Sequence, residues 1–508
     1  MAHDTLNVEP AYPAFQSAYD NGAPQIVWTH LISDLETPVS AWLKLGQDQA
    51  NAFLLESVEG GAMRGRYSFI GLSPDLIWRC RGNDAEINRQ ALTNAHAFEP
   101  CGAGALESLR ALIGECEIPN LPPKLPPMAS SLVGYMGYDM VRLMEHLPDE
   151  PEDTLGIPDG LFIRPTVMAV FDGVEDRITL VTPVRPADGV GAAEAYDAAC
   201  GRLAEVVNQL EQPLPPTASA LARAEAGPGP EVAANMTKDT FKAHVLKARE
   251  YVYAGDVFQV VPSQRFSVPF ELPPFSLYRA LRRLNPSPFL FFFNLEGFSV
   301  VGSSPEILVR VRDNRVTIRP LAGTRRRGAN EAEDRALAEE LQNDPKELAE
   351  HLMLLDLARN DVGRVAKIGS VEVLAQFEIE RYSHVIHLSS TVEGELDPAY
   401  DPFGALIAGF PAGTLSGAPK VRAMEIIDEL EPEKRGIYAG CIGYFAADGS
   451  MDTCIGLRTA LVKDNVMYVQ AGVGVVADSD PDAEYQESVD KAAALVRAAG
   501  EAVRFAPQ

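Results

Sequence analysis

The sequence predicts a mixed α+β protein whose strands pair mainly antiparallel. Strand-forming segments flank short turns at Asp313-Asn314 and Asp464-Asn465, and such turns favour β-hairpins. Residues 237–255, 345–362 and 480–499 carry the start or stop signals of helices. Helices interspersed with hairpins are typical of an α+β fold and not of a doubly wound parallel sheet.

The two hairpins follow from alternating apolar residues on either side of each turn. The first is expected to span residues 307–312 and 316–321, and the second residues 453–462 and 466–472. A further short strand is expected at 257–261.

A proline-rich segment predicts how the chain is divided. Residues 211–236 contain five prolines among alanine, glycine and glutamate, a composition typical of a linker or a surface loop. We therefore expect an N-terminal region, 1–210, and a C-terminal region, 237–508.

Composition excludes several classes of protein. The 508 residues carry a formal net charge of −27, which disfavours DNA and anionic membranes as partners. No apolar run approaches the roughly 18 residues of a membrane-spanning helix, and the N-terminus is unlike a signal peptide. Six cysteines without CxxC spacing indicate reduced thiols, so we expect a cytoplasmic protein.

Two predicted helices each carry a Glu-x-x-Glu pair near their start. Glu347 and Glu350 share one helical face, and Glu484 and Glu487 share another. Carboxylate oxygens on two helices could bind one Mg²⁺ together with substrate oxygens and waters. The commoner alternative is that such glutamates sit in water and stabilise the helix dipole.

The second hairpin places an arginine beside two glycines. If Asp464-Asn465 is a two-residue turn, Arg458 lies level with Ala471, next to Gly472 and Gly474. A guanidinium beside exposed backbone amides suits a carboxylate. Alternatively, the glycines mark a bulge and the arginine lies in solvent.

Two further segments carry side chains capable of chemistry. Residues 411–419 expose the hydroxyls of Thr414 and Ser416 ahead of a helix whose N-terminus would attract an anion. His387 lies close to His384 in an apolar run, where a core histidine is the commoner alternative to an acid or base.

Four segments, in this order along the chain, resemble motifs of the chorismate-binding enzymes. They are residues 320–325, 350–361, 411–420 and 470–474. Within that family the chain is most similar to the anthranilate synthase component I branch, through residues 54–57, 66–71 and 285–291. The resemblance implies a four-layer α/β/β/α arrangement with two large, mostly antiparallel sheets.

The resemblance also implies roles for individual residues. Direct Mg²⁺ ligands would be Glu350 and Glu487, with Glu347 and Glu484 acting through water. Contacts to chorismate would come from Gly323, Thr324, Tyr438, Arg458, Gly472, Val473 and Gly474. Catalytic residues would be His387 near the leaving group, Glu306 as the acid for the C4 hydroxyl, and Thr414 beside the ring.

A tryptophan feedback site is implied in the N-terminal region and the 285–291 segment. Its residues would be Glu56, Ser57, Pro288, Phe289 and Leu290. Phe289 and Leu290 replace the commoner tyrosine and methionine, which removes a phenol hydroxyl and a thioether.

The implied reaction converts chorismate and ammonia to anthranilate and pyruvate, the first step of tryptophan biosynthesis. No cysteine lies in a Gly-x-Cys-x-Gly nucleophile setting. Ammonia would therefore come from a separate glutamine amidotransferase subunit, in a heterodimer or heterotetramer.

Three alternatives remain open. Isochorismate and salicylate synthases carry a lysine base where this chain has Gln259, and glutamine cannot serve as a base. Aminodeoxychorismate synthase carries a lysine where this chain has Ala322. The chain could also be a tryptophan-sensing protein without catalysis, which the intact set of candidate catalytic residues disfavours.

Overall fold

The structure, a computed structural model, describes residues 6–59, 63–119, 121–126, 128–215, 230–382 and 385–506. Of the predictions above, residues 216–229 of the linker and His384 lie outside the described residues. No helix in the described ranges is long and apolar enough to cross a membrane.

The N-terminal region contains both helices and strands, including the long strand β3 (Met63–Arg81). The helices are α1 (Tyr12–Asp20), α2 (Pro38–Leu45), α3 (Ala105–Cys116) and α4 (Ala192–Leu210), with a 3-10 turn at Tyr138–Leu143. The strands are β1 (Gln25–Ile32), β2 (Ala52–Glu59), β3 (Met63–Arg81), β4 (Asp84–Asn88), β5 (Glu99–Pro100), β6 (Ser131–Met136), β7 (Gly160–Asp172) and β8 (Arg177–Val184).

Elements of the C-terminal region alternate between helices and hairpins. The helices are α5 (Lys238–Ala254), α6 (Pro274–Leu284), α7 (Glu331–Asn343), α8 (Pro345–Gly363), α9 (Pro402–Gly409), α10 (Gly413–Ser416), α11 (Lys420–Leu430) and α12 (Pro481–Ala502), followed by a 3-10 turn at Val503–Phe505. The first strands are β9 (Ala233–Ala234), β10 (Gln259–Val260), β11 (Ser263–Pro269), β12 (Phe289–Leu295), β13 (Phe298–Ser304), β14 (Ile307–Arg312), β15 (Arg315–Ile318) and β16 (Leu321–Arg326). The later strands are β17 (Glu372–Arg381), β18 (Val385–Glu395), β19 (Gly417–Ala418), β20 (Cys441–Ala446), β21 (Met451–Ile455), β22 (Thr459–Lys463) and β23 (Val466–Gly472).

The strands form a mostly antiparallel assembly, which confirms the α+β prediction. Among the described residues, hydrogen bonds link 21 strands into one network, and β10 pairs separately with β19. Strand β3 spans 19 residues and pairs with β2, β4 and β7, so it joins groups of strands that could otherwise form separate sheets. The division into four layers with two sheets stays a prediction.

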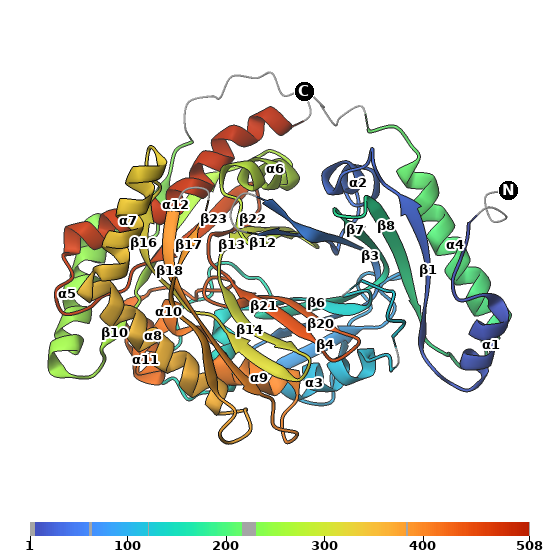
Figure 1. The fold of residues 1–508 in the computed structure, drawn as a ribbon, viewed down its shortest axis with the longest axis horizontal. Helices are drawn as coiled ribbons and strands as arrows, with labels where there is room; N and C mark the ends of the chain where they lie inside the picture. Colours follow the sequence, from blue (N-terminus) through green and yellow to red (C-terminus); the bar gives the residue numbers. More distant parts are fainter. Residues whose placement is uncertain are drawn as a thin grey trace.

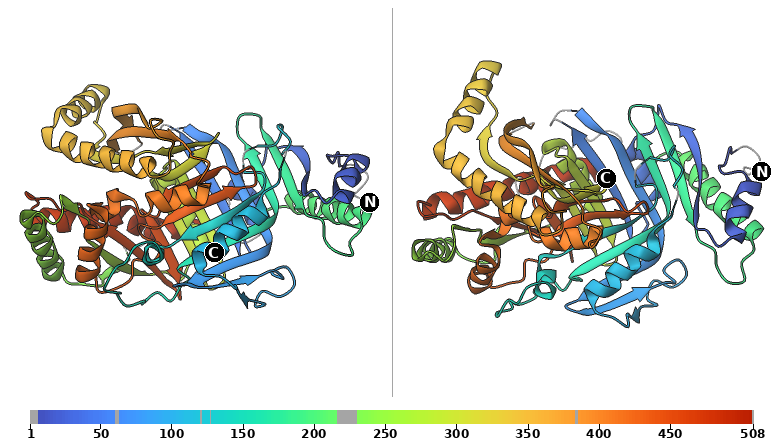
Figure 2. Two further views of the ribbon diagram at one scale, coloured as in Figure 1. Left: turned by 90° about the horizontal axis from the view of Figure 1, so that it is seen from below. Right: turned by 60° about the horizontal axis from the view of Figure 1, so that its bottom comes forward.

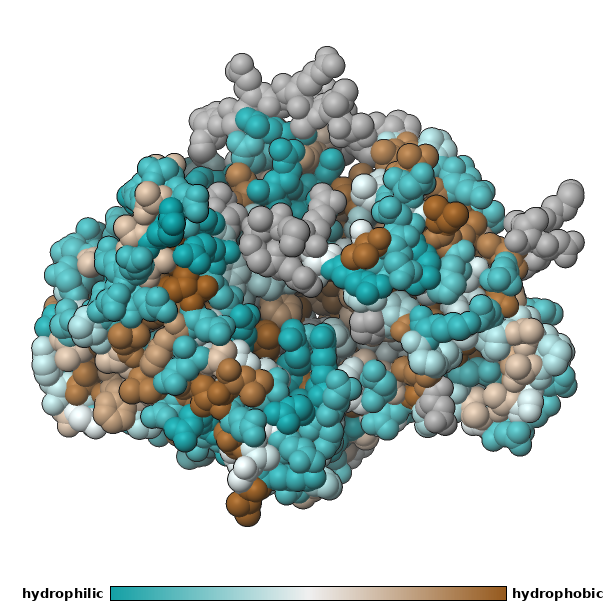
Figure 3. Space-filling model, in the orientation of Figure 1, coloured by the Kyte–Doolittle hydropathy of each residue, from teal (hydrophilic) through white to brown (hydrophobic). Residues whose placement is uncertain are grey.

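Helices lie at both ends of the strand assembly. Figures 1 and 2 show α7 and α8 at one end and α1 and α4 at the other, with the strands between them. Helix α12 packs against α5, α6 and β23. The face shown in Figure 3 is mainly hydrophilic, with separate apolar patches, as expected for a chain with this many acidic residues.

The regions on either side of the predicted linker share sheets and core. Strand β2 pairs with β12, and β6 pairs with β20. One apolar cluster combines Trp42 and Leu54 with Phe275, Leu281 and Leu495. The boundary at 211–236 stays a prediction, but the two regions bury their apolar side chains together.

Most of the predicted helices and turns are confirmed. Helix α5 begins after Thr237, whose hydroxyl accepts a hydrogen bond from the Thr240 amide, and ends at Gly255 with φ 83°. Helices α8 and α12 begin within a residue of the predicted positions, and they are capped by Asp344 and Asp480.

The hairpin turns also have the predicted geometry. Both residues of Asp313-Asn314 and of Asp464-Asn465 have positive φ, and Lys463 pairs with Val466.

Three predicted strands are shorter than expected. The segment 453–462 is interrupted at Gly456, because the backbone of Gly456 bonds to Ala439 and Gly440 instead of continuing the ladder. Segment 316–321 breaks at Pro320, which has no amide hydrogen to donate. Only Gln259–Val260 of segment 257–261 pairs as a strand.

Candidate active site

His387 is held by the irregular ladder between β16 and β18. It pairs with Thr324, and a bulge at Gly323 interrupts the register. Gly323 has φ 60°, and a Cβ there would lie 2.8 Å from Leu341 Cδ1, so the position needs glycine. The carbonyl oxygen of Gly323 lies 3.0 Å from His387 Nδ1.

These contacts fix the protonation state of His387. Burial and the nearby Arg458 guanidinium lower the pKa of His387 to about 4, so the ring is neutral at pH 7. The Gly323 carbonyl can only accept a hydrogen bond, which assigns the proton to Nδ1. His387 Nε2 is then an acceptor, and it is buried without a partner among the described residues.

Glu306 is a buried carboxylic acid in the turn between β13 and β14. The residue is 6% exposed, and burial raises the pKa of its carboxyl from 4.5 to about 8. The Leu321 amide donates a hydrogen bond to Glu306 Oε1 at 3.3 Å. Glu306 is therefore mainly protonated at pH 7 and can donate a proton.

Thr414 and Glu306 line the same small cavity. A space of about 30 Å³ is lined by Glu306, Thr414, Leu354 and Ile455, among others. That is room for about one water molecule. The Thr414 hydroxyl is near enough to Glu306 to lower the pKa of its carboxyl against the larger effect of burial, and Thr414 Oγ1 has no well-aligned hydrogen-bond partner among the described residues.

Arg458 and Tyr438 lie at the end of the second hairpin. Arg458 has φ 48°, and its carbonyl accepts a hydrogen bond from the Ser303 amide at 3.2 Å. Its side chain is half-buried, makes no hydrogen bond to a described residue, and interacts electrostatically with Glu306. The structure thus places the predicted arginine and the predicted acid together.

The glycines at the end of β23 and just after it allow a close approach of neighbouring side chains. A Cβ at Gly472 would lie 2.7 Å from Tyr438 Oη, and one at Gly474 would lie 2.4 Å from Gln259 Nε2. Val473 is fully buried, and its amide donates to the Pro262 carbonyl. Among the candidate substrate contacts, Val473 therefore contributes packing, and the glycines contribute space.

The four predicted metal ligands lie on α8 and α12. Burial, with the charges of Glu347, Asp478 and Glu484, raises the pKa of Glu350 to about 7 against the opposing effect of Lys346. Burial also raises the pKa of Glu484, with a contribution from Glu487. The carboxylates on the two helices therefore lie close enough to raise the pKa of Glu350 and that of Glu484.

This carboxylate cluster has the donor chemistry of a Mg²⁺ site. Hard divalent cations prefer carboxylate oxygens, and mutually repelling carboxylates gain from a shared cation. In the described ranges, no three Asp, Glu, His or Cys side chains are arranged to hold a metal ion together. The donor set fits Mg²⁺, and the assignment of ligands stays a prediction.

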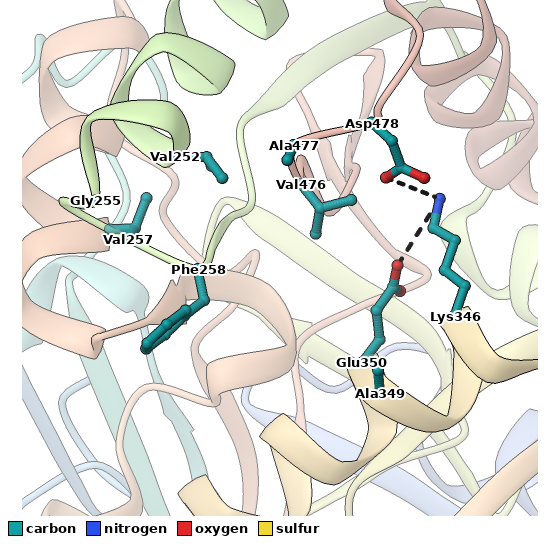
Figure 4. Close-up of a pocket in the computed structure, with 10 residues that line it drawn as sticks. All are labelled: Val252, Gly255, Val257, Phe258, Lys346, Ala349, Glu350, Val476, Ala477 and Asp478. Atoms are coloured by element: carbon teal, nitrogen blue, oxygen red, sulfur yellow. Dashed lines mark ion pairs between the residues drawn. The ribbon is translucent and has the colours of Figure 1, made fainter.

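A pocket of about 420 Å³ opens beside this cluster. Figure 4 shows Lys346, Glu350 and Asp478 on one side, with Val257 and Phe258 among the apolar residues opposite. Lys346 Nζ lies 3.4 Å from Asp478 Oδ1 and 3.9 Å from Glu350 Oε1. The predicted metal ligand Glu350 thus borders a space that a small molecule can enter.

Comparison with known proteins identifies the family. The model of the chorismate binding enzymes matches residues 94–497. The chain belongs to the chorismate-binding enzyme family.

Relatives of this chorismate-binding enzyme include anthranilate synthases. Anthranilate synthase component 1 of Cereibacter sphaeroides is 56% identical over 496 residues, which is 98% of each chain. The Pseudomonas putida protein of the same name is 47% identical over 92% of this chain and 93% of its own.

Solved structures of similar proteins agree with the fold. Anthranilate synthase component I from Streptococcus pneumoniae TIGR4 has a TM-score of 0.75 at 35% identity, covering 92% of this chain and 99% of that one. The Escherichia coli isochorismate synthase MenF has a TM-score of 0.69 at 21% identity over 95% of this chain and 99% of its own, which shows a shared fold alone.

The segments predicted to bind tryptophan also meet in this chorismate-binding enzyme. Strands β2 and β12 place Glu56 opposite Leu290. The Glu56 carboxylate already accepts hydrogen bonds from Tyr278 Oη at 2.5 Å and from Arg282 Nη2 at 2.8 Å, and Leu290 is buried in the core. Ser57, Phe289 and Pro288 are therefore the members of the set with side chains still exposed in part.

Sequence reasoning missed the basic residues beside the glutamates. Arg325 donates to Glu347 Oε1 at 2.8 Å, and Lys491 Nζ lies 2.8 Å from Glu487 Oε1. Two lysines could have been found from helical spacing, because each stands four residues from a predicted ligand. Lys346 precedes Glu350, and Lys491 follows Glu487. Arg325 follows the candidate substrate contacts on β16, but its pairing with a helix could not be read from spacing.

Proposed function

We propose that this chain is the catalytic large subunit of anthranilate synthase, a Mg²⁺-dependent lyase. It would convert chorismate and ammonia to anthranilate and pyruvate. Similarity to proteins named anthranilate synthase component 1 along nearly the whole chain supports the assignment. The observation that carries the chemistry is a protonated Glu306 beside the Arg458 guanidinium and the neutral His387.

Arg458 and Tyr438 would hold one carboxylate of the substrate. Chorismate carries two carboxylates, on the ring and on the enolpyruvyl side chain. A half-buried guanidinium that makes no hydrogen bond to a described residue gains from pairing with a carboxylate in a site of reduced dielectric. The close approach of Tyr438 to Gly472 allows its hydroxyl and the backbone near the glycine to face the same group.

Glu347, Glu350, Glu484 and Glu487 would hold Mg²⁺, directly or through water. When bound, Mg²⁺ supplies positive charge that neutralises the ring carboxylate. The carboxylates of α8 and α12 would otherwise repel that substrate group, which explains why a cation is required between them.

Glu306 is the group suited to protonate the departing C4 hydroxyl. It carries a proton at pH 7, whereas His387 offers only an unprotonated Nε2 toward the site. Ammonia adds at C2 as the C4 hydroxyl leaves with the proton from Glu306. His387 Nε2 can orient an adjacent hydroxyl by accepting its hydrogen. Loss of the C2 proton and of pyruvate then gives the aromatic ring.

Two positions favour ammonia over other nucleophiles. Gln259 cannot deprotonate water, so hydroxylation at C2 lacks a base. Ala322 cannot attack the ring as a lysine amine would, which leaves C2 free for ammonia. Ala322 is half-buried at the start of β16, beside Gly323.

The proposal includes a partner and a regulator. A glutamine amidotransferase subunit would supply ammonia in a heterodimer or heterotetramer. Tryptophan would bind where β2 meets β12, near Ser57, Pro288 and Phe289, and lower the affinity for chorismate. The proximity of Glu56 and Leu290 across these strands supports one shared regulatory pocket.

Product identity tests the proposal directly. The purified chain is incubated with chorismate, Mg²⁺ and ammonium at alkaline pH, and products are separated by chromatography. Anthranilate and pyruvate in equal amounts are expected. Isochorismate, salicylate or aminodeoxychorismate as the main product would reject it.

A further inference from the structure

The four glutamates proposed to bind Mg²⁺ are accompanied by three basic side chains. Each basic group lies next to one carboxylate: Arg325 Nη1 is 2.8 Å from Glu347 Oε1, Lys491 Nζ is 2.8 Å from Glu487 Oε1, and Lys346 Nζ is 3.9 Å from Glu350 Oε1. The protein therefore carries its own counter-ions for the carboxylate cluster.

Lys346 is the least firmly held of these three cations. Arg325 also donates to Glu340 and to Asp344, and Lys491 also donates to the Gly472 carbonyl at 3.0 Å. Among the described residues, Lys346 makes two ion pairs, with Asp478 and Glu350, and both are longer than an ordinary hydrogen bond.

The position of Lys346 connects the two metal-binding helices. Figure 4 shows its side chain between Glu350 on α8 and Asp478, which lies in the segment before α12. Its side chain is 55% exposed and borders the 420 Å³ pocket. The ammonium can therefore swing on its flexible stem without disturbing packed residues.

We propose that Lys346 is a positioning residue that competes with the divalent cation for Glu350. Its ammonium links α8 to the segment before α12, and an arriving cation displaces it from Glu350 while Asp478 retains it. This inference rests on the proposed Mg²⁺ site. A divalent cation attracts the carboxylate about twice as strongly as an ammonium at the same distance, so the exchange favours the metal.

The competition has a functional consequence. Lys346 lowers the affinity of the protein for metal alone, because cation binding must break one ion pair and bring positive charges together. Substrate carboxylates compensate that charge, so the metal binds more tightly when the substrate is present. By linkage, the substrate binds more tightly to the metal-loaded protein.

Calorimetric titration of the full chain with Mn²⁺, without chorismate, tests the inference. A unit charge about 5 Å from a divalent cation in water-like surroundings changes affinity by roughly 16-fold, and screening by salt at about 0.1 M reduces this effect to roughly fivefold. Lys346→Gln should therefore bind Mn²⁺ at least about fivefold more tightly than the parental protein. Lys346→Arg keeps the charge and should stay close to the parental affinity.

Lys242→Gln provides a matched control. Lys242 pairs at 2.7 Å with Asp482, which lies in the first turn of α12 but is not a proposed ligand. This variant removes the same charge near the same helix and should leave Mn²⁺ affinity unchanged. Equal tightening in Lys242→Gln and Lys346→Gln would reveal a general charge effect and overturn the competition.

A double variant separates this inference from the metal site itself. Glu350→Gln should weaken Mn²⁺ binding, and adding Lys346→Gln to it should then tighten binding less than it does in the parental protein, because only charge repulsion is relieved and no Glu350 carboxylate remains to compete for. A gain in the double variant as large as in the parental protein would overturn the inference. If the parental protein binds no Mn²⁺, or if Glu350→Gln binds it normally, the proposed metal site fails as well. If Glu350→Gln weakens Mn²⁺ binding but Lys346→Gln binds Mn²⁺ as the parental protein does, the metal site stands and the competition is rejected.

Discussion

Replacing Glu306 by glutamine tests the proton donor in the proposed mechanism. Glutamine keeps the shape and can still accept the Leu321 amide hydrogen bond, but it cannot give up a proton. Loss of a positioned acid typically slows a reaction by about 10²- to 10⁴-fold. We therefore expect Glu306→Gln to bind chorismate and to form anthranilate at least about 100 times more slowly.

The same substitution has a predictable effect on stability. Burial raises the pKa of Glu306 from 4.5 to about 8. Between these pH values the folded protein keeps a proton that the unfolded chain has released, so the parental protein loses stability as pH rises. The full difference of 8 − 4.5 is worth about 5 kcal/mol at about 1.4 kcal/mol per pKa unit. Glutamine has no proton to lose, so the variant lacks this decline.

Denaturant unfolding at several pH values measures the difference. The stability of Glu306→Gln relative to the parental protein should grow by up to about 1.4 kcal/mol for each pH unit from 4.5 toward 8, and then level off. Glu339→Gln, an exposed change on α7, serves as the control with no such trend. Parallel pH profiles for Glu306→Gln and the parental protein would show that Glu306 is ionised in the folded state, and the acid role would be wrong.

Four further predictions address the metal, the regulator, the product and the partner. Glu350→Gln and Glu487→Gln should each stay folded and lose most activity at limiting Mg²⁺. Near-normal turnover of one variant at limiting Mg²⁺ would exclude the replaced residue as a ligand. Ser57→Phe should abolish tryptophan binding, measured by calorimetry, while sparing activity without tryptophan. There is little spare room around Ser57, because a Cβ built on Gly65 would lie only 1.8 Å from Ser57 Oγ. Unchanged tryptophan binding would refute the site. Ala322→Lys should lose anthranilate formation and show added mass after incubation with chorismate, and a folded variant with parental turnover would show that Ala322 does not decide the product. The isolated chain should use ammonium and not glutamine, and glutamine-dependent turnover by the pure chain would contradict the need for a second subunit.

Local chemistry made the helices and turns predictable from the sequence. Asp344 and Asp480 cap α8 and α12 through neighbouring backbone amides, and the Asp464-Asn465 turn needs only its own residues to set the register. Contacts between distant segments were not predictable in this way. The break at Gly456 depends on backbone hydrogen bonds to residues 439–440, which cannot be predicted from the local sequence pattern.

Much of the site could be predicted as a set of residues, but not as a set of protonation states. The resemblance named Glu306, His387 and Arg458, and the structure brings them together. The burial that keeps the acid protonated and the imidazole neutral arises from segments far apart in the chain. Likewise, Glu56 is engaged by Arg282, 226 residues away, so its occupied carboxylate could not be inferred from the sequence.

The protonation states impose opposing requirements on pH. Free ammonia increases as pH rises toward the pKa of ammonium, roughly 9, whereas Glu306 loses its proton near pH 8. With ammonium as the nitrogen source, the rate should therefore rise and then fall, and its maximum should lie between these two values. A partner that delivers ammonia directly removes the rising limb, because the nucleophile no longer depends on the bulk equilibrium. Glutamine-dependent activity of the complex should keep only the falling limb set by Glu306, and Glu306→Gln should remove that limb from the residual rate. A complex whose glutamine-dependent rate continued to rise above pH 8 would show that the proton comes from another group.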